Sequence, residues 1–262
     1  MRRSAALVFG ILSLFAATLS AQTEPDYSEW TRILKTYYDP AKGMDYAALK
    51  AKDMQTVANL RAGLGKVDAA ALNPKQRLAY WMNVYNINTV DLILNNYPLK
   101  GIRDLSTDPI TRVNVFKKDR VPTPKGMLSL MKVEDEHIRE AYKDARIHFA
   151  INCAARSCPP MRQEAFTGAQ VDAQLDDSTR RFMAGNGARV VKKGNGAVVT
   201  TTKIMSGFPW FGKDFENWAG GRAAFVRKYL PPAKAALLPA DNKSIDFEYD
   251  DYNWALNDAK IQ

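Results

Sequence analysis

The sequence predicts an α+β fold: a single globular domain in which several helices surround a small, largely antiparallel sheet. Three observations support this prediction. Segments with helical periodicity fill the first half of the chain, a clear hairpin pattern lies in the second half, and helices and strands do not alternate regularly as in a βαβ fold. Nothing resembles a linker or a repeat, and the length suffices for one sizeable core. We therefore expect residues 22–262 to form one domain.

Residues 1–21 have the pattern of a secretory signal peptide. Two arginines are followed by an apolar run from Ala5 to Ala17, and cleavage is expected after Ala21. The run is shorter than the roughly 20 residues of a membrane-spanning helix. An uncleaved anchor is the alternative, because Leu19 is unusual three residues before a cleavage site. We expect a periplasmic or secreted protein with no stable membrane span after cleavage.

The charge of the chain is moderately basic, with 37 Lys and Arg residues, 28 Asp and Glu residues and a formal net charge of +9. The basic residues are dispersed and are not interleaved with aromatic residues as on a nucleic-acid-binding face. We therefore expect no nucleic-acid partner. No cofactor is expected either. A small molecule or a peptide of unknown identity is the expected ligand.

The first half of the chain is predicted to be mainly helical. Apolar residues recur at helical spacing over 27–38, where Asp39-Pro40 ends the helix, and a second helix follows over 46–64. The strongest pattern starts at Asn73-Pro74, an N-cap followed by proline at the first helical position, and continues to Asn95.

Two asparagines in this third helix are candidate site residues. Asn83 and Asn86 lie three positions apart and hence on one side of the helix. Asparagine gains little from a helix interior, so the pair either caps neighbouring backbone or lines a polar site. Trp81 and Tyr85 lie on the apolar stripe and are predicted to be core residues.

The second half is predicted to mix helices and strands. Ser129 is a predicted N-cap, and turn residues at 192–196 indicate a hairpin. In chain order we expect a short strand at 113–116, a loop at 117–120, helices at 129–142 and 171–183, hairpin strands at 189–191 and 197–202, and a last helix at 223–230.

A central stretch from Arg146 to Met161 holds both cysteines and one of the two histidines. Ile147, Phe149 and Ile151 alternate with His148, Ala150 and Asn152, which predicts a strand that opens into a loop at Cys153. On a regular strand the His148 and Cys153 side chains point to opposite faces, about 16 Å apart. They form a pair only if a bulge or turn breaks the alternation.

Five blocks of the sequence carry a family resemblance. They are Tyr80-Trp-Met-Asn-Val-Tyr-Asn86, Leu128-Ser-Leu-Met-Lys-Val-Glu134 with Ile138-Arg139, Arg146 to Pro160, Lys203-Ile204 with Trp210 and Asp214-Phe215, and Tyr252-Asn-Trp-Ala-Leu-Asn257. Together these blocks resemble the domain of unknown function 547 family of bacteria and plants. The family often has His where this chain has Asp135, and Asp where it has Asn253. Some plant members keep only the first cysteine, which places more functional weight on Cys153. The resemblance implies a fold and a cluster of polar residues, without an established reaction.

Three interpretations of the cysteines remain open. The first is a structural disulfide between Cys153 and Cys158, the only cysteines of a chain expected to be exported. The second is a Cys153 nucleophile. In this case His148 or His137 is the base, and the base or an oxyanion is supported by Asn83, Asn86, Asn152 or Glu134. The third is a zinc site at His148, Cys153 and Cys158, which lacks an established spacing motif and a fourth ligand.

The expected function is that of a cysteine-dependent hydrolase or acyl transferase acting on a peptide, amide or ester. The alternative is a non-catalytic extracytoplasmic binding or scaffold module in which the cysteines form a structural disulfide. Lys203, Trp210 and Asp214 are candidates for the rim of a ligand site, or else they cap the last helix and pack the tail. Glu134 and Arg139 could form an ion pair instead of serving catalysis.

Overall fold

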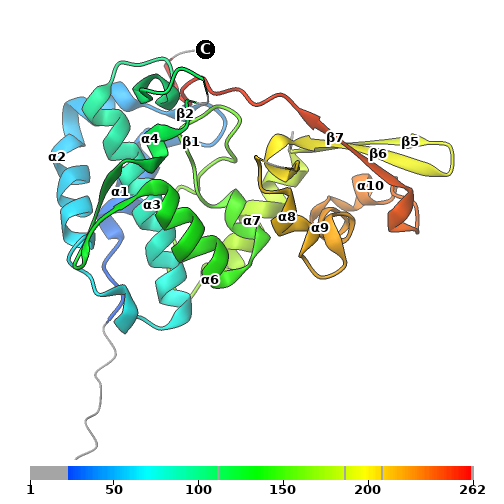
Figure 1. Ribbon diagram of the computed structural model, residues 1–262, viewed down its shortest axis with the longest axis horizontal. Coiled ribbons are helices and arrows are strands. Elements are labelled where there is room, and N and C mark those ends of the chain that lie inside the picture. Colours follow the sequence, from blue (N-terminus) through cyan, green and yellow to red (C-terminus); the bar gives the residue numbers. More distant parts are fainter. Residues whose placement is uncertain (1–22, 111, 186, 208, 261–262) are drawn as a thin grey trace, which may run out of the picture.

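The longest helix, α3 (Pro74–Asn96), runs through the interior of one part of the molecule (Figure 1). Asn73 begins it with a capping box: its side chain accepts hydrogen bonds from the N–H groups of Lys75 and Gln76, and Gln76 accepts one from the N–H of Asn73. All residues from 78 to 90 are buried, so other elements cover α3 on every side. This computed structural model describes residues 23–110, 112–185, 187–207 and 209–260.

Two helices before α3 confirm the sequence prediction. In α1 (Ser28–Tyr37) the predicted apolar face is buried, and α2 (Tyr46–Leu64) packs against both α1 and α3. The Asp45 side chain caps α2 by accepting a hydrogen bond from the N–H of Ala48. A two-stranded pair, β1 (Tyr38–Asp39) and β2 (Gly43–Met44), connects the two helices.

The predicted helix at 129–142 is one helical segment with a wide turn inside it. Ser129 caps it by accepting a hydrogen bond from the N–H of Lys132. It consists of α5 (Leu130–Lys132), a π-helical stretch η3 (Val133–Arg139) and α6 (Glu140–Tyr142). π-helical turns are rare and frequent at functional sites. This one carries Glu134, Asp135 and Arg139.

The strands form three small sheets. β3 (Asp119–Thr123) and β4 (Gly126–Ser129) make an antiparallel hairpin. This first hairpin was not predicted. The one predicted hairpin is confirmed as β5 (Ala188–Lys193) and β6 (Gly196–Thr202), which pair antiparallel. β7 (Ile245–Asp250) adds parallel to β6 and was not predicted. The architecture is thus α+β, as expected.

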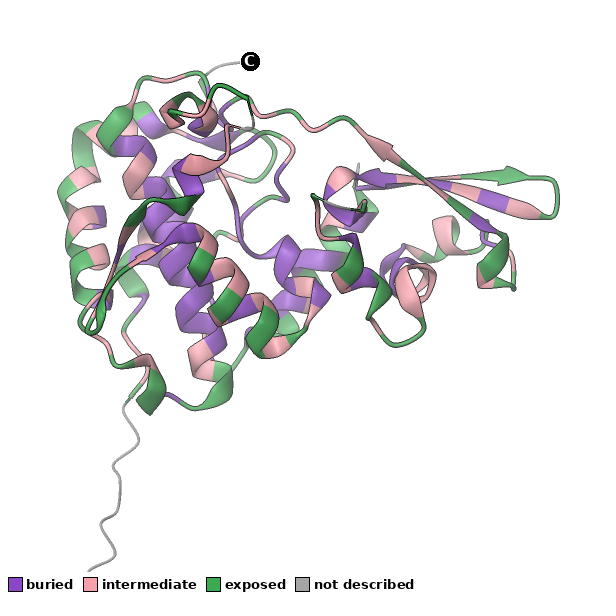
Figure 2. Ribbon diagram, viewed as in Figure 1, coloured by how far each residue is buried: buried purple, intermediate pink, exposed green. Residues whose placement is uncertain are grey.

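Two hydrophobic clusters divide the molecule into two lobes. What we call the helical lobe lies around α1 to α6, including the short α4 (Asn114–Lys117). The sheet lobe lies around β5 to β7, α8 (Gly212–Glu216) and α9 (Gly221–Tyr229). Figure 2 shows buried residues concentrated along α3 and on α7 (Val171–Ala184), which lies between the lobes. The 3-10 helix η4 (Ala145–Phe149) joins both clusters, since Ile147 belongs to the first and Phe149 to the second.

Two predicted strands are wrong. Residues 146–152 form the end of η4 and a loop, because Asp144 caps a 3-10 turn at Arg146 and because His148, Ala150 and Asn152 are buried along with the apolar residues. The alternation of residue types therefore does not reflect alternating exposure. The predicted strand at 113–116 is a helical turn, α4 (Asn114–Lys117), and part of the predicted loop at 117–120 belongs to β3.

The last predicted helix is present as α9 (Gly221–Tyr229), and the predicted helix at 171–183 as α7. The predicted signal peptide and its cleavage site lie outside the described residues. Within the described ranges, no helix has the length and apolar character needed to cross a membrane. The remaining short elements are η1 (Ala69–Ala71), η2 (Ile102–Leu105), η5 (Lys203–Met205), α8 (Gly212–Glu216), α10 (Pro232–Ala235) and η6 (Asn242–Ser244).

Candidate functional site

A cavity of about 420 Å³ lies where the two lobes meet. The helical lobe supplies one wall, and the segment from η5 to α8 supplies the other together with the C-terminal tail (residues 251–260). Its surface is mainly apolar and aromatic, with a few polar groups, as is typical of small-molecule sites. It is lined by Tyr85, Val113, Phe116, Met131, Glu134, Asp135, Arg139, His148, Ile151, Cys153, Cys158, Pro159, Ile204, Pro209, Trp210, Phe211, Tyr252 and Trp254.

Both cysteines reach this cavity from a tightly turned loop. The buried Asn152 side chain accepts a hydrogen bond from the N–H of Ala154 at 2.8 Å and donates one to the carbonyl of Pro159 at 2.9 Å. Ala154 has a φ of +63°, a left-handed conformation that costs energy for a residue with a Cβ. This turn folds the chain back so that Cys158 lies beside Cys153.

The C-terminal tail holds this loop in place. The N–H of Arg156 donates to the carbonyl of Ala255, and the N–H of Asn257 donates to the carbonyl of Ala154, both at 2.9 Å. The Asn257 side chain also donates to the side chain of Asn152 at 3.1 Å. These bonds place Tyr252, at the start of the tail, against the two sulfur atoms.

The sulfur atom of Cys158 lies at the centre of a small hydrogen-bond network. The Tyr252 hydroxyl is 3.0 Å from the Sγ of Cys158 and 3.4 Å from the Sγ of Cys153, and the N–H of Cys153 donates to the Sγ of Cys158 at 3.2 Å. Both cysteines are free thiols in the structure. The predicted disulfide partners are therefore neighbours that no covalent bond joins.

The two thiols differ in acidity. Burial opposes ionisation of Cys158, but hydrogen bonds from Cys153, from Tyr252 and from backbone N–H groups outweigh it and lower the pKa of its thiol. The hydrogen bond to Cys158, together with burial, raises the pKa of Cys153 well above its ordinary value. Of the pair, Cys158 is therefore the sulfur that ionises first, and Cys153 acts as a hydrogen-bond donor to it.

Glu134 is the titratable carboxyl on the same cavity wall. Burial raises its pKa to about 7, with a further contribution from Asp135, while Arg139 and a hydrogen bond with Tyr85 act in the opposite direction. The negative charge of Cys158 adds to the increase, so Glu134 lies close enough to sense the thiolate. A carboxyl with this pKa can both donate and accept a proton near neutral pH.

His148 is fixed by a carboxylate and two aromatic rings. Its Nε2 is 2.7 Å from the Oδ2 of Asp214, and its ring stacks on Phe211 with centroids 4.4 Å apart and tilts against Phe215 at 5.5 Å. Burial lowers the pKa of His148, although Asp214 opposes this. Burial also acts on Asp214, but hydrogen bonds from His148 and Arg139 hold the pKa of its carboxyl well below the usual range.

His148 and Cys153 line the same cavity, although they were predicted to point apart. The hydrogen bonds of the described residues pair His148 with Asp214, and Cys153 with Cys158 and Tyr252. His137, the other proposed base, stacks on Trp81 with centroids 4.2 Å apart and is not a cavity-lining residue. Among the described residues, neither histidine thus forms a hydrogen-bonded dyad with a thiol.

The two candidate asparagines act as backbone clamps, and neither is a cavity-lining residue. Asn83 donates to the carbonyl of Phe166 and accepts from its N–H, at 2.8 and 3.0 Å. Asn86 donates to the carbonyl of Ala150 and accepts from the N–H of Asn152, at 3.0 and 2.9 Å. Asn86 therefore anchors the segment that leads into the cysteine loop, whereas Asn83 anchors a different loop.

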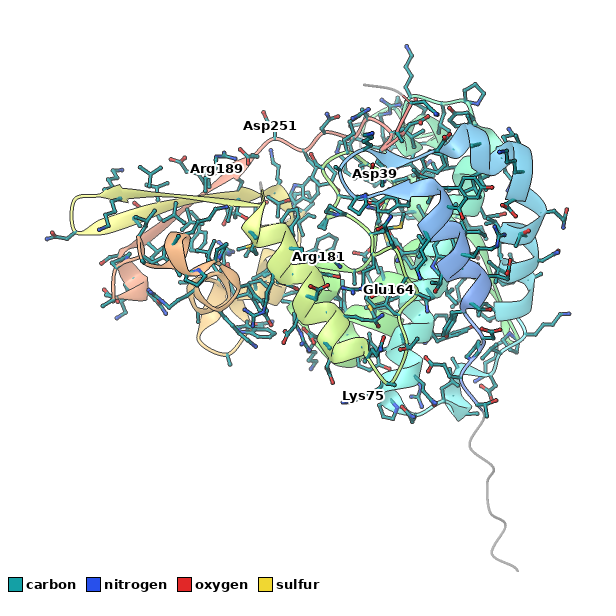
Figure 3. All side chains as sticks on the ribbon, turned by 180° about the vertical axis from the view of Figure 1, so that it is seen from behind. Asp39, Lys75, Glu164, Arg181, Arg189 and Asp251 are labelled. Carbon is teal, nitrogen blue, oxygen red and sulfur yellow. The ribbon has the colours of Figure 1, made fainter. Side chains whose placement is uncertain are left out.

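The predicted rim residues have three different positions. Trp210 lines the cavity and packs on Tyr252, with ring centroids 4.8 Å apart. Asp214 bonds to Arg139 and His148. Arg139 also forms an ion pair with Asp135, so its carboxylate partners are Asp135 and Asp214 instead of the suggested Glu134. Lys203 pairs with the exposed Asp251, which Figure 3 labels and which begins the tail directly after β7.

A metal site at the cysteines finds no support in the donor arrangement. Across 23–110, 112–185, 187–207 and 209–260, no group of three or more His, Cys, Asp or Glu side chains has a geometry that could hold a metal ion.

The sequence analysis missed two features of the site: Tyr252 as a site residue, and the contact of Asp214 with His148. The closing block Tyr252 to Asn257 was the available signal, because it belongs to the family pattern while lying far from the cysteines in the chain.

Comparison with known proteins adds a family for part of the chain. Residues 69–183 match the family model described as "Protein of unknown function, DUF547". Residues 69–183 belong to the DUF547 family. No curated protein and no solved structure matches the chain significantly. The DUF547 segment contains Glu134, His148 and both cysteines, whereas Asp214 and Tyr252 lie beyond it, so the cavity needs residues from outside the matched segment.

Proposed function

We propose that this protein is a thiol-dependent hydrolase or acyl transferase that acts on a peptide, amide or ester, with Cys158 as the nucleophile. One observation carries the proposal. The Cys158 sulfur accepts a hydrogen bond from the N–H of Cys153 and lies 3.0 Å from the Tyr252 hydroxyl, in a cavity that also contains the protonatable Glu134. A thiolate stabilised in this way is nucleophilic at neutral pH without a hydrogen-bonded histidine.

The first half-reaction uses the thiolate and the acid form of Glu134. The Cys158 sulfur attacks the carbonyl carbon of the substrate, and the bond to the leaving group breaks as Glu134 donates its proton to that group. A thioester to Cys158 results. The pKa of about 7 provides a substantial fraction of protonated Glu134 at neutral pH.

The second half-reaction reverses the role of Glu134. Water, or an acceptor such as an amine or alcohol, attacks the thioester carbon and gives its proton to the Glu134 carboxylate. The carbon–sulfur bond breaks and the Cys158 thiolate leaves, stabilised again by Tyr252 and by the N–H of Cys153. His148, held by Asp214, forms part of the cavity wall and positions Phe211.

The test is acyl-enzyme formation with p-nitrophenyl acetate and p-nitrophenyl benzoate. Native protein is expected to release a burst of one nitrophenol per chain and to gain one acyl group, mapped to Cys158 by peptide mass. Cys158→Ser should abolish the burst, and Glu134→Gln should reduce turnover at least tenfold. An equal burst in native protein and Cys158→Ser, or no burst in native protein, would refute the proposal.

The same preparation tests the alternative of a scaffold with a structural disulfide. Intact mass is measured after alkylation with and without prior reduction. If alkyl groups add only after reduction, and reduced protein shows no acyl burst, then the scaffold function replaces the enzymatic one. Uptake of alkyl groups by native, unreduced protein at Cys158 supports the thiol-dependent function.

A further inference from the structure

Cys153 is the nucleophilic group of the cavity that the acyl-transfer cycle leaves unused. That cycle requires a single thiolate, yet a second thiol lies beside it. Both sulfur atoms are within hydrogen-bond distance of the single Tyr252 oxygen, at 3.0 and 3.4 Å, and the N–H of Cys153 points at the Cys158 sulfur at 3.2 Å. Two free thiols this close can be joined by a disulfide with little movement of the backbone.

We propose that Cys158 and Cys153 form a redox-active dithiol that reduces disulfide substrates, with Cys158 as the attacking thiol and Cys153 as the resolving thiol. This activity goes beyond the proposed acyl transfer and shares only the Cys158 sulfur with it. The substrate class is a disulfide flanked by apolar or aromatic groups, because Trp210, Tyr252 and Trp254 line the cavity as one aromatic cluster.

The first step of the exchange is an attack by the Cys158 thiolate on one sulfur of the substrate disulfide. The substrate S–S bond breaks, one substrate thiolate leaves, and a mixed disulfide to Cys158 forms. The hydrogen bonds around Cys158 favour this assignment of the attacking sulfur, because the thiolate is the reactive form.

The second step uses Cys153. Its thiol passes a proton to the Glu134 carboxylate of the same cavity, and its sulfur attacks the Cys158 sulfur of the mixed disulfide. The second substrate thiolate leaves and the Cys153–Cys158 disulfide forms. Two electrons move from the protein dithiol to the substrate, so the substrate disulfide is the oxidant and no other co-reactant is required.

Formation of the mixed disulfide also replaces the interaction that keeps Cys153 protonated. In the dithiol state, Cys153 donates its proton toward the Cys158 thiolate, and this interaction holds the pKa of Cys153 high. Once Cys158 is bonded to substrate sulfur, it carries no charge, so the pKa of Cys153 falls and its thiolate becomes accessible. The loss of charge on Cys158 in the first step therefore activates Cys153 for the second step.

The test uses 4,4′-dithiodipyridine, a small neutral aromatic disulfide, at one equivalent per chain of the reduced full-length protein. Native protein should release two thiopyridone molecules from each molecule of probe. Its intact mass should then show no adduct, and its cysteines should resist alkylation until they are reduced. A stable adduct on native protein, with only one thiopyridone released from each probe molecule, would overturn the proposal, as would no reaction.

Variants assign the two roles. Cys153→Ser should release one thiopyridone per chain and retain the other half of the probe as an adduct at Cys158. Cys158→Ser should react at least tenfold more slowly. Circular dichroism checks that both variants fold, and the native stoichiometry tests the proposal without them. The readout also requires no ester turnover, so a failure of the p-nitrophenyl ester assay leaves this result interpretable on its own.

Discussion

At the scale of single residues, Tyr252 is the side chain that decides the state of the thiol pair. Its hydroxyl is closer to Cys158 than to Cys153, and it stabilises a negative charge on sulfur. A hydrogen bond to a charged group contributes roughly 1.5–3 kcal/mol. This interaction favours the thiolate, so Tyr252 contributes to the lowered pKa of Cys158.

We therefore predict that Tyr252→Phe raises the pKa of Cys158, because the thiolate loses a hydrogen-bond partner. The rate of alkylation by iodoacetamide, measured from pH 5 to pH 10 in native protein and variant, reports this pKa. Tyr249→Phe is the matched control, because the Tyr249 hydroxyl bonds to Arg222 instead of a thiol. Superimposable pH profiles for native protein and Tyr252→Phe would contradict the assigned role.

A second prediction at this scale concerns Asp214. It accepts hydrogen bonds from Arg139 and bonds to His148, so Asp214→Asn should lower the free energy of unfolding by about 2 kcal/mol at pH 7. The folded-state pKa of Asp214 is depressed, so its contribution is present above the unfolded pKa near 3.9 and is lost as the pH falls below that value.

Urea unfolding at pH 7 and pH 3 measures both parts of this prediction. The difference between native protein and Asp214→Asn should shrink at pH 3. Asp250→Asn is the control: its partner Arg189 is exposed, so its effect should stay below about 1 kcal/mol. A difference between native protein and Asp214→Asn that is larger at pH 3 than at pH 7 would be inconsistent with the depressed pKa.

At the scale of elements, α3 holds two different loops through asparagine clamps. Asn83→Ala and Asn86→Ala each leave one buried carbonyl and one buried N–H without a partner, which should cost about 2–4 kcal/mol of stability. Only the Asn86 clamp leads into the cysteine loop. We predict that Asn86→Ala also changes the alkylation rate of Cys158, whereas Asn83→Ala changes stability alone.

Thermal unfolding and iodoacetamide alkylation of both variants provide the measurement. Asn96→Ala is a matched control on the same helix, since the Asn96 side chain is exposed and bonds to the carbonyl of Leu92 within the helix. It should change stability by less than about 0.5 kcal/mol. Equal alkylation rates of Cys158 in all three variants would contradict the predicted effect of the Asn86 clamp on the cysteine loop.

Elements with local signals were predictable, and those set by tertiary contacts were not. Asn73 and Ser129 cap their helices through neighbouring residues, so their patterns sufficed. Residues 146–152 have the alternation of a strand, but the lobes bury both of its faces and the chain forms a 3-10 turn instead. β7 lacked a hairpin signal because it pairs parallel to β6 from a distant position.

The candidate site follows the same rule. Cys153, Cys158, Glu134 and His148 were predicted to be site residues, and all four line one cavity. Their pairing could not be predicted, since it depends on contacts with Asp214 and Tyr252 that lie 66 and 94 residues away in the chain from His148 and Cys158. Asn83 and Asn86 within a helix indicated either bonds to neighbouring backbone or a polar site. In the structure both bond to backbone groups of neighbouring loops.

At the scale of the whole molecule, the tail connects the lobes. After β7 it returns to the helical lobe, where the carbonyl of Asn257 accepts a hydrogen bond from the N–H of Met44 and Leu256 bonds to Lys100 (Figure 1). Gly43 makes this approach possible: it has a φ of +108°, and a Cβ there would lie 2.0 Å from the carbonyl oxygen of Asn257.

We predict that Gly43→Ala displaces the tail and, through Tyr252, slows alkylation of Cys158 at pH 7 severalfold, because the pKa of the thiol rises. Gly126→Ala is the matched control: Gly126 has a φ of +118°, but a Cβ there would meet no described residue beyond its chain neighbours within 4 Å. It introduces similar backbone strain without touching the tail. Limited proteolysis should cleave the tail faster in Gly43→Ala alone; equal cleavage in both variants would contradict this mechanism.

The path of the tail has a consequence for biosynthesis. The cysteine loop at 153–158 is translated about a hundred residues before the segment that holds it, which spans 252–257. Until that segment has left the ribosome, the two thiols lack Tyr252 and their backbone partners, and they have the ordinary reactivity of unfolded cysteines. The catalytic chemistry proposed for this cavity therefore starts only after residues 252–257 have been synthesised, about a hundred residues after the nucleophile, which protects the growing chain from its own thiol.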